Sequence, residues 1–228
     1  DFLVLIISYM NDIANLCELV GADITDVAKG MSYDERIGAR FLNAGIGFGG
    51  SCFPKDTKAL KFLAKEHGYQ LKTVEACVDV NSAQKTRLFE KAKERMISFS
   101  GLKVAVLGLT FKAGTDDLRE APSIDNLRLL LEAGADIYAY DPKGAERSKQ
   151  LFPEGKIGQG YMNYVDTIDK ALEHANICFV FTEWPEIRSV TPEEFKKKMH
   201  TSLVYDGRNL YQPSEMKKEG VEYYSIGR

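Results

Sequence analysis

Short apolar segments alternate with helical ones through the second half of the chain, and this alternation constrains the fold most. Strand-like runs rich in β-branched and aromatic residues occupy residues 103–109, 136–141, 177–182, 203–208 and 222–227. Helical patterns separate most of them, at residues 121–134, 168–175, 191–199 and 212–220. Strands that alternate with helices predict a parallel, doubly wound sheet. Ligands of such sheets bind beyond the carboxyl ends of the strands, here just after Leu109, Asp141, Thr182 and Arg208.

The first part of the chain reads as helices only. Residues 2–20 form an apolar helical run that stops at Gly21, and Asp23 is a suitable N-cap for a short second helix. A third long helix is predicted over residues 73–97, and its charged second half suggests a solvated connector or a dimer element. The fold class is therefore α/β, with an all-helical domain over residues 1–98 and a parallel-sheet domain over residues 101–228.

Composition excludes several classes of function. The net charge of −3 offers no broad basic surface, so no nucleic-acid partner is expected. The 4 cysteines are widely scattered and there are only 3 histidines, so no metal site is expected. Free thiols suit a cytoplasmic protein. The apolar run near the start, residues 2–10, is too short to span a bilayer, so no membrane partner is expected.

A single cysteine follows a glycine-rich loop in residues 41–60, FLNAGIGFGGSCFPKDTKAL. Cys52 stands where a helix begins, with Pro54 in its first turn, and the positive end of a helix dipole favours a thiolate. Asp56 follows four residues later, on the same helix face, as a candidate proton acceptor. The alternative is a small buried hydrophobic cysteine, since no histidine partner is nearby.

A second polar loop follows the first predicted strand, in residues 108–123, GLTFKAGTDDLREAPS. It lacks the GxGxxG pattern, so it does not predict dinucleotide binding. Phe111 offers a stacking face for a base or sugar, and Lys112 offers charge to a phosphate. The alternative is an ordinary loop in which Asp116 and Asp117 cap the next helix. Asp141, before a proline, is interpreted as a turn former rather than a ribose-binding acid.

Both loops resemble segments of one enzyme family. GFGGSCFPKDTKAL (residues 47–60) closely resembles the catalytic-cysteine segment of nucleotide-sugar dehydrogenases, and GLTFKAGTDDLRE (residues 108–120) resembles the opening of their UDP-binding domain. The resemblance to this UDP-glucose/GDP-mannose dehydrogenase family covers the chain but only the back part of the family protein. It implies a central helical dimerisation domain, a Rossmann-like UDP-sugar-binding domain, and an N-terminal NAD-binding domain that is absent from this chain.

The resemblance implies an NAD-dependent, four-electron oxidation of UDP-glucose to UDP-glucuronate. Cys52 would attack the intermediate aldehyde to form a thiohemiacetal, which is oxidised to a thioester, and Asp56 would help to activate the hydrolytic water. Without the NAD-binding domain, the chain would be inactive alone. The PKDTKAL and FKAGTDDLRE segments favour UDP-glucose over GDP-mannose. Two alternatives remain: a dehydrogenase for another nucleotide sugar such as GDP-mannose, or a non-catalytic nucleotide-sugar-binding and dimerisation module.

Site residues are implied position by position. Substrate contacts correspond to Arg40, Asn43, Ala44, Gly45, Ile46, Gly47, Phe48, Gly49, Phe111, Lys112 and Arg208. Arg40 corresponds to a residue that reaches the ligand across a homodimer built on the central helices, although alone it reads as a surface charge. Contacts to NAD correspond to Cys52, Lys55 and Arg119, of which Lys55 also reads as a solvated lysine.

Overall fold

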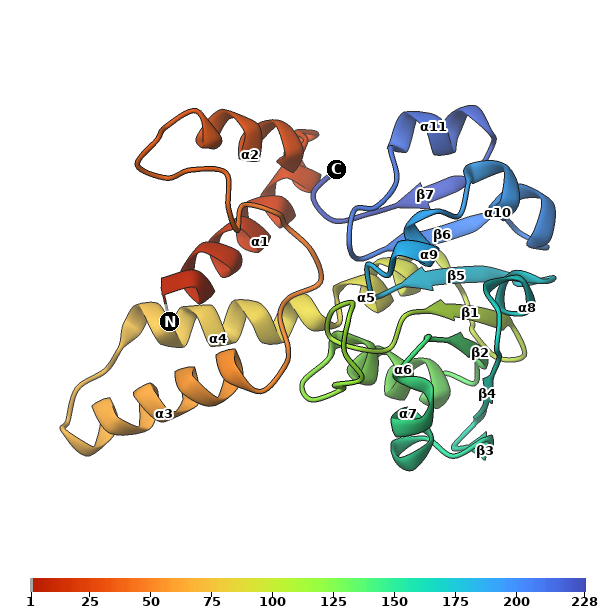
Figure 1. The fold of residues 1–228 in the computed structure, drawn as a ribbon, viewed down its shortest axis with the longest axis horizontal. Helices are drawn as coiled ribbons and strands as arrows, with labels where there is room; N and C mark the ends of the chain where they lie inside the picture. Colours follow the sequence, from red (N-terminus) through yellow and green to blue (C-terminus); the bar gives the residue numbers. More distant parts are fainter. Residues whose placement is uncertain (1) are drawn as a thin grey trace.

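The computed structural model describes residues 2–228, and its N-terminal part is helical (Figure 1). Within the described residues, the helices before the first strand are α1 (Phe2–Val20), α2 (Ile24–Ser32), α3 (Cys52–Glu66), α4 (Lys72–Lys85) and α5 (Arg87–Arg95). Gly21 takes a positive φ of 72° after α1, and the Asp23 carboxylate accepts from the Thr25 N–H at the start of α2. The predicted end of α1 and the predicted N-cap of α2 are confirmed.

The predicted helix over residues 73–97 is wrong, because the chain breaks at Thr86 into α4 and α5. The Asn126 side-chain amide donates to the Lys85 carbonyl (2.7 Å), so a tertiary contact stabilises the break. The solvated-connector interpretation is also wrong for α5. Its apolar face is buried through Leu88, Phe89 and Ala92, and it packs on the sheet region.

One sheet organises the rest of the chain. Its strands are β1 (Lys103–Leu107), β2 (Asp136–Tyr140), β3 (Gly155–Ile157), β4 (Gly160–Tyr164), β5 (Ile177–Val180), β6 (Leu203–Asp206) and β7 (Glu222–Tyr224). The spatial order is β3-β4-β2-β1-β5-β6-β7, and every pair is parallel except β3 with β4. The chain winds outward from β1 in both directions, so the switch point lies between β1 and β5. The predicted parallel α/β fold is confirmed.

Helices cover this sheet and connect its strands. They are α6 (Pro122–Glu132), α7 (Ala145–Leu151), α8 (Ile168–Leu172), α9 (Pro185–Arg188), α10 (Pro192–Lys198) and α11 (Pro213–Lys218). The elements α7, β3, β4 and α9 did not follow from the sequence. Glycines at 155, 158 and 160 interrupt the stretch of β3 and β4, and Tyr161 of β4 is exposed, so the alternation there is weak.

Alternate residues of each central strand serve the two faces of the sheet. Val104 and Val106 of β1 join one core, together with the buried faces of α1, α5 and α6. Ala105 and Leu107 join the other, together with buried side chains of α8, α10 and α11. The first core is continuous with the helical part, so the two predicted parts of the chain share apolar packing.

Helix α1 is apolar and long enough to cross a membrane by length and composition. Its 19 residues exceed the run of residues 2–10 that the sequence pattern isolates. Such a helix is weak evidence for a span, because core helices share these properties. Met10 and Ala14 are buried in the core, and the Ser8 hydroxyl donates to the Cys77 carbonyl of α4 (3.3 Å).

A nearly buried ionic cluster joins α1, α5 and the C-terminal segment. The Glu18 carboxylate accepts from Arg87 (2.7 Å), Lys91 (2.8 Å) and the Gly227 N–H (2.8 Å). Burial raises the pKa of Glu18, but these donors outweigh it and hold the pKa below its usual value. The Ile24 N–H also donates to the Gly227 carbonyl (2.8 Å), which ties the end of the chain to α2.

Candidate functional site

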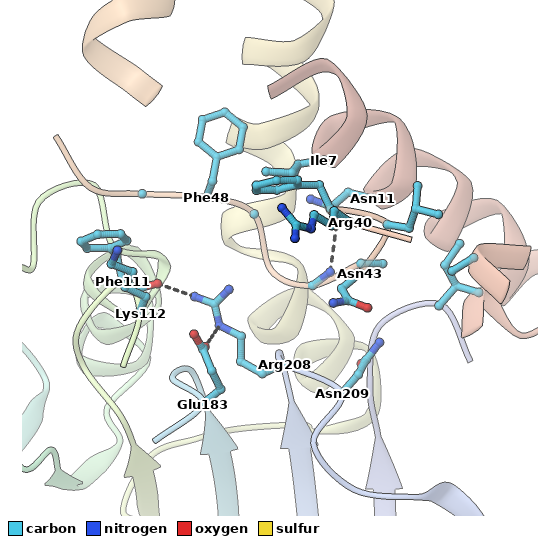
Figure 2. A pocket seen from close by; sticks show the side chains of 18 of the residues that line it. Ile7, Asn11, Arg40, Asn43, Phe48, Phe111, Lys112, Glu183, Arg208 and Asn209 are labelled. Carbon is cyan, nitrogen blue, oxygen red and sulfur yellow. Dashed lines mark hydrogen bonds and ion pairs between the residues drawn. The ribbon is translucent and has the colours of Figure 1, made fainter. Parts of the chain in front are cut away.

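A cavity of about 1140 Å³ lies between the helical part and the carboxyl ends of the strands (Figure 2). The strand ends that face it are those of β1, β5 and β6, at the switch point where parallel sheets bind ligands. Asp141, after β2, is not among its lining residues. Three of the four strand ends predicted to carry the ligand site therefore line the cavity.

Arg208 dominates the sheet side of the cavity. Its Nε donates to the Phe181 carbonyl (2.8 Å) and lies 3.2 Å from a Glu183 carboxylate oxygen. One Nη donates to the Phe111 carbonyl (2.8 Å), and Figure 2 shows the guanidinium directed between β5 and the Phe111 loop. Burial lowers the pKa of Arg208. The remaining Nη faces the cavity beside Gly45, where it can donate to a bound anion.

Asp141, which does not line the cavity, holds the loop after β1 through hydrogen bonds to its backbone. This buried carboxylate accepts from the Leu109 and Thr110 N–H groups (2.6 and 3.1 Å) and from the Trp184 indole N–H (3.1 Å). It also accepts from the Lys143 and Gly144 N–H groups of its own turn. Asp141 is therefore a structural turn residue, as the sequence interpretation proposed, and it orients the chain into Phe111 and Lys112. The Lys112 ammonium lies 5.4 Å from the centre of the Phe111 ring.

The opposite side of the cavity is the glycine-rich loop, residues 43–51. Side-chain amides from two helices hold its backbone. Asn11 of α1 accepts from the Gly45 N–H (2.9 Å), and Gln84 of α4 donates to the Gly45 carbonyl (2.7 Å). Asn81 of α4 accepts from the Phe48 N–H (2.8 Å) and donates to the Phe48 carbonyl (3.2 Å). A Cβ at Gly47 would lie 2.6 Å from the Asn81 Oδ1, so this approach requires glycine.

Cys52 is the first residue of α3 and lines the cavity. It is exposed, whereas Cys17, Cys77 and Cys178 are buried, so the alternative of a small buried hydrophobic residue does not apply to Cys52. Its sulfur lies 3.8 Å from the Ser51 hydroxyl. Asp56 stands one helical turn further along α3, 3.5 Å from Lys55 Nζ, and neither of these two residues is among the lining residues.

The structure brings the substrate candidates together. Arg40 and Asn43 lie on the helical side with the loop glycines, and Phe111, Lys112 and Arg208 lie on the sheet side. Arg40 lines the cavity of its own chain. Ile46 alone among these candidates is not a lining residue. Its side chain is fully buried against Gly207, and its N–H donates to the Gly207 carbonyl (3.1 Å).

Neither the turn after β1 nor the predicted NAD contacts Lys55 and Arg119 place a dinucleotide at this cavity. Gly108 occupies the turn after β1, but a Cβ there would lie 2.7 Å from the Thr182 nitrogen, so this glycine permits packing against β5 rather than a phosphate. Lys55 and Arg119 do not line the cavity, and Arg119 is paired with Asp117 (2.7 Å). No group of three or more histidine, cysteine or acidic side chains is placed to hold a metal within residues 2–228.

Several lining residues were not identified from the sequence. Ile7 and Asn11 come from α1, Glu183 follows β5, and Asn209 and Gln212 follow β6. Glu183 and Asn209 sit directly after predicted strands, so the strand-end rule carried a signal for them. Nothing in the local pattern of α1 distinguishes Asn11 from an ordinary helix residue.

A parallel sheet with a charged cavity at its switch point, closed by a cysteine-bearing loop, defines a ligand-binding α/β protein with a candidate nucleophile. Comparisons with known proteins are more specific. Residues 1–83 match the central domain of the UDP-glucose/GDP-mannose dehydrogenase family, and residues 105–213 match the UDP binding domain of the same family. The chain belongs to the UDP-glucose/GDP-mannose dehydrogenase family.

Curated relatives and solved structures agree with this assignment. The chain is 42% identical over 227 residues to UDP-glucose 6-dehydrogenase TuaD of Bacillus subtilis, covering 100% of the chain and 48% of the relative. It is 42% identical over 228 residues to the UDP-glucose 6-dehydrogenase of Pseudomonas aeruginosa, covering 100% of the chain and 50% of the relative. A UDP-glucose dehydrogenase structure from Pyrobaculum islandicum matches with a TM-score of 0.85 and 31% identity, covering 98% of the chain and 48% of that structure.

The chain spans about half the length of the curated relatives it matches.

Proposed function

We propose that the whole protein is an NAD-dependent UDP-glucose 6-dehydrogenase that converts UDP-glucose to UDP-glucuronate. One observation carries the proposal: the exposed thiol of Cys52 and the guanidinium of Arg208 line the same cavity from opposite sides. A binding module needs no thiol at this place. The names of the curated relatives support UDP-glucose as the substrate rather than GDP-mannose.

In this proposal, the cavity binds the nucleotide sugar across its two sides. Arg208 and Lys112 bind the diphosphate, and the Phe111 ring packs on the base or a sugar. Arg40, Asn43 and the backbone of residues 44–49 hold the glucose end. Figure 2 shows these groups converging on the space between the loop and the strand ends.

The C6 alcohol is first oxidised to the aldehyde by loss of a hydride and a proton. The Cys52 thiolate adds to this aldehyde to form a thiohemiacetal, and a second two-electron oxidation of the adduct gives a thioester. Water oriented by Asp56 displaces the sulfur and releases the carboxylate. The oxidations need a hydride acceptor, for which the family implies a nicotinamide dinucleotide, NAD. Lys55 and Arg119, which lie outside the lining of the cavity, are proposed as contacts to it.

The domain division and the oligomeric state are part of the same proposal. Residues 1–98 act as the central helical domain and residues 101–228 as the UDP-sugar-binding domain. Helix α1 leaves an apolar face exposed through Phe2, Tyr9, Leu16, Leu19 and Val20. Such a face supports a homodimer through the central helices. Placement in the cytoplasm stays a prediction.

Calorimetric titration of the chain tests the sugar-nucleotide site. We expect UDP-glucose to bind and GDP-mannose to bind at least about 10-fold more weakly, a difference of roughly 1.4 kcal/mol. An Arg208→Ala variant, with the Arg128→Ala variant as a surface control, should lose the UDP-glucose signal. Equal binding of both nucleotide sugars, or binding that survives in the Arg208→Ala variant, would contradict the assignment of this site.

A further inference from the structure

Glu120 lies where the cysteine loop meets the sheet domain, although it is not among the lining residues of the candidate site and belongs to no predicted site. It is a non-glycine residue with a positive φ of 55°, between the loop after β1 and the start of α6. L-residues rarely adopt this conformation, and it persists where surrounding contacts determine it. The contacts of Glu120 are therefore informative.

The backbone of the cysteine loop rests directly on this segment. The Gly50 N–H donates to the Arg119 carbonyl (2.7 Å). A Cβ at Gly49 would lie 2.8 Å from the Glu120 carbonyl carbon and closer still to its oxygen, so only glycine permits this approach. A Cβ at Gly50 would lie 2.8 Å from a carbon of the Phe111 ring. Cys52 follows two residues later.

The Glu120 carboxylate joins two further elements to this junction. One oxygen accepts from Lys58 of α3 (2.9 Å), the helix that begins at Cys52. The other oxygen accepts from Lys85 at the end of α4 (2.7 Å). Lys85 is buried, and its carbonyl is held by Asn126 of α6, so it is fixed at both ends. The two lysines lower the pKa of Glu120 to about 2, so the carboxylate is ionised at neutral pH.

Cys52 lies near enough to Arg119 to affect the pKa of this arginine. Asp117 raises the pKa of Arg119, and the nearby Cys52 sulfur acts in the same direction. The segment from Arg119 to Ala121 contacts Gly49 and Gly50, which precede Cys52, and Glu120 is the side chain that joins this segment to α3 and α4.

We propose that Glu120 is a positioning residue: its carboxylate clamps α3 and α4 to the sheet domain and so sets where Cys52 stands relative to Phe111 and Lys112. The consequence for catalysis rests on the proposed function. The claim that Glu120 positions the cysteine loop does not rest on the proposed function, because it concerns only the contacts that hold this loop.

The test compares Glu120→Gln with a matched control, Glu146→Gln, in the chain without ligand. Glu146 pairs with Lys149 (2.8 Å) on the exposed surface of α7, so its replacement removes a similar ion pair far from the loop. Hydrogen exchange in Glu120→Gln should accelerate about 10-fold over residues 48–53 while β1 stays unchanged. The control should leave both regions unchanged. Equal acceleration in the loop and in β1 would indicate general destabilisation and would overturn the proposal.

Alkylation of Cys52 by iodoacetamide gives the second readout, because the other cysteines are buried. In Glu120→Gln, a loosened loop should raise the alkylation rate by roughly 3-fold, measured by mass spectrometry of the intact chain. Faster exchange with an unchanged alkylation rate would mean that Glu120 does not position the thiol, and would overturn the proposal.

A second variant covers the case in which Glu120→Gln fails to fold. Lys58→Met removes only the exposed arm of the clamp and leaves Lys85 paired. It should accelerate loop exchange and Cys52 alkylation in the same direction by a smaller factor, and no change in either would overturn the proposal. Neither measurement uses UDP-glucose, so failure of the titration would count against the proposed function and leave the clamp untouched.

Discussion

The two sides of the cavity are built with different chemistry. On the sheet side, buried carboxylates organise the loops: Asp141 gathers N–H groups behind Phe111, and Asp206 accepts from the Arg208, Leu210 and Tyr223 donors. On the helical side, the neutral amides of Asn11, Asn81 and Gln84 hold the glycine-rich loop.

This difference reflects what each side has to hold. A carboxylate accepts several converging donors, and strand ends in a parallel sheet present several free N–H groups together. An irregular loop presents N–H and carbonyl groups in turn, and an amide can both donate and accept. Loss of a carboxylate on the sheet side should therefore lower the stability of the whole fold. Loss of an amide on the helical side should instead loosen mainly the glycine-rich loop that it holds.

The largest effect is expected from Asp141→Ala. The substitution removes the hydrogen-bond acceptor of the Leu109 and Thr110 N–H groups and of the Trp184 indole N–H, all of which are buried. It should therefore lower the free energy of unfolding by about 4 kcal/mol. Urea denaturation measures this loss. The control Asp116→Ala breaks only the exposed pair with Arg147 and should change stability by less than about 0.5 kcal/mol. A loss below 1 kcal/mol for Asp141→Ala would show that charge does not organise the sheet side.

On the helical side, Asn81→Ala should cost about 2 kcal/mol, because both backbone groups of Phe48 lose their partner. The loss should be accompanied by faster hydrogen exchange in residues 45–49 and little change in β1. Gln70→Ala, which breaks an exposed hydrogen bond to Glu75, is the matched control. Uniform acceleration across the sheet would contradict a local role for the amides.

A smaller effect is expected from Arg208→Lys, which keeps the positive charge but removes the several separate N–H donors of the guanidinium. Lysine cannot contact Phe181, Phe111 and a ligand at once, so affinity for UDP-glucose should fall about 10-fold, or roughly 1.4 kcal/mol. Calorimetry measures this change, with Arg128→Lys as the control. Unchanged affinity would mean that charge alone serves the ligand, and the contrast between the two sides would be weaker.

The smallest effect is expected from Cys52→Ala. The thiol is exposed and makes only a 3.8 Å contact with Ser51, so stability should change by less than about 0.5 kcal/mol. UDP-glucose affinity should also stay within about 3-fold, while alkylation by iodoacetamide disappears. A clear loss of stability would show that Cys52 holds the loop rather than serving chemistry.

Much of the architecture could be predicted from sequence, and the failures have identifiable causes. The strands at β1, β5 and β6 are short apolar runs, so their first residues and the strand-end site followed directly, whereas each predicted strand runs two residues past the observed carboxyl end. The break at Thr86 did not, because the contact that stabilises it comes from Asn126, about forty residues away. Elements β3 and β4 were missed because glycines and an exposed tyrosine mask the alternation.

The residues of the candidate site also divide into those that the sequence indicates and those that only the tertiary structure reveals. Residues on the two loops, such as Cys52 and Lys112, carry local signals in glycine, proline and charge. Glu183 carries only the weaker signal of its place after a predicted strand. Asn11 carries no local signal, and its place in the cavity appears only when α1 is packed against the glycine-rich loop.

The sequence by itself determined the alternating α/β order, the glycine-rich cysteine loop and the family, since these depend on neighbouring residues and periodicity. Only the tertiary structure decided that Cys52 and Arg208 share one cavity, that amides hold one side and carboxylates the other, and that Glu120 joins three elements. The physical reason is distance along the chain: Lys58, Lys85 and Glu120 have no local relation, and only packing of the helices on the sheet brings their charges within hydrogen-bonding reach.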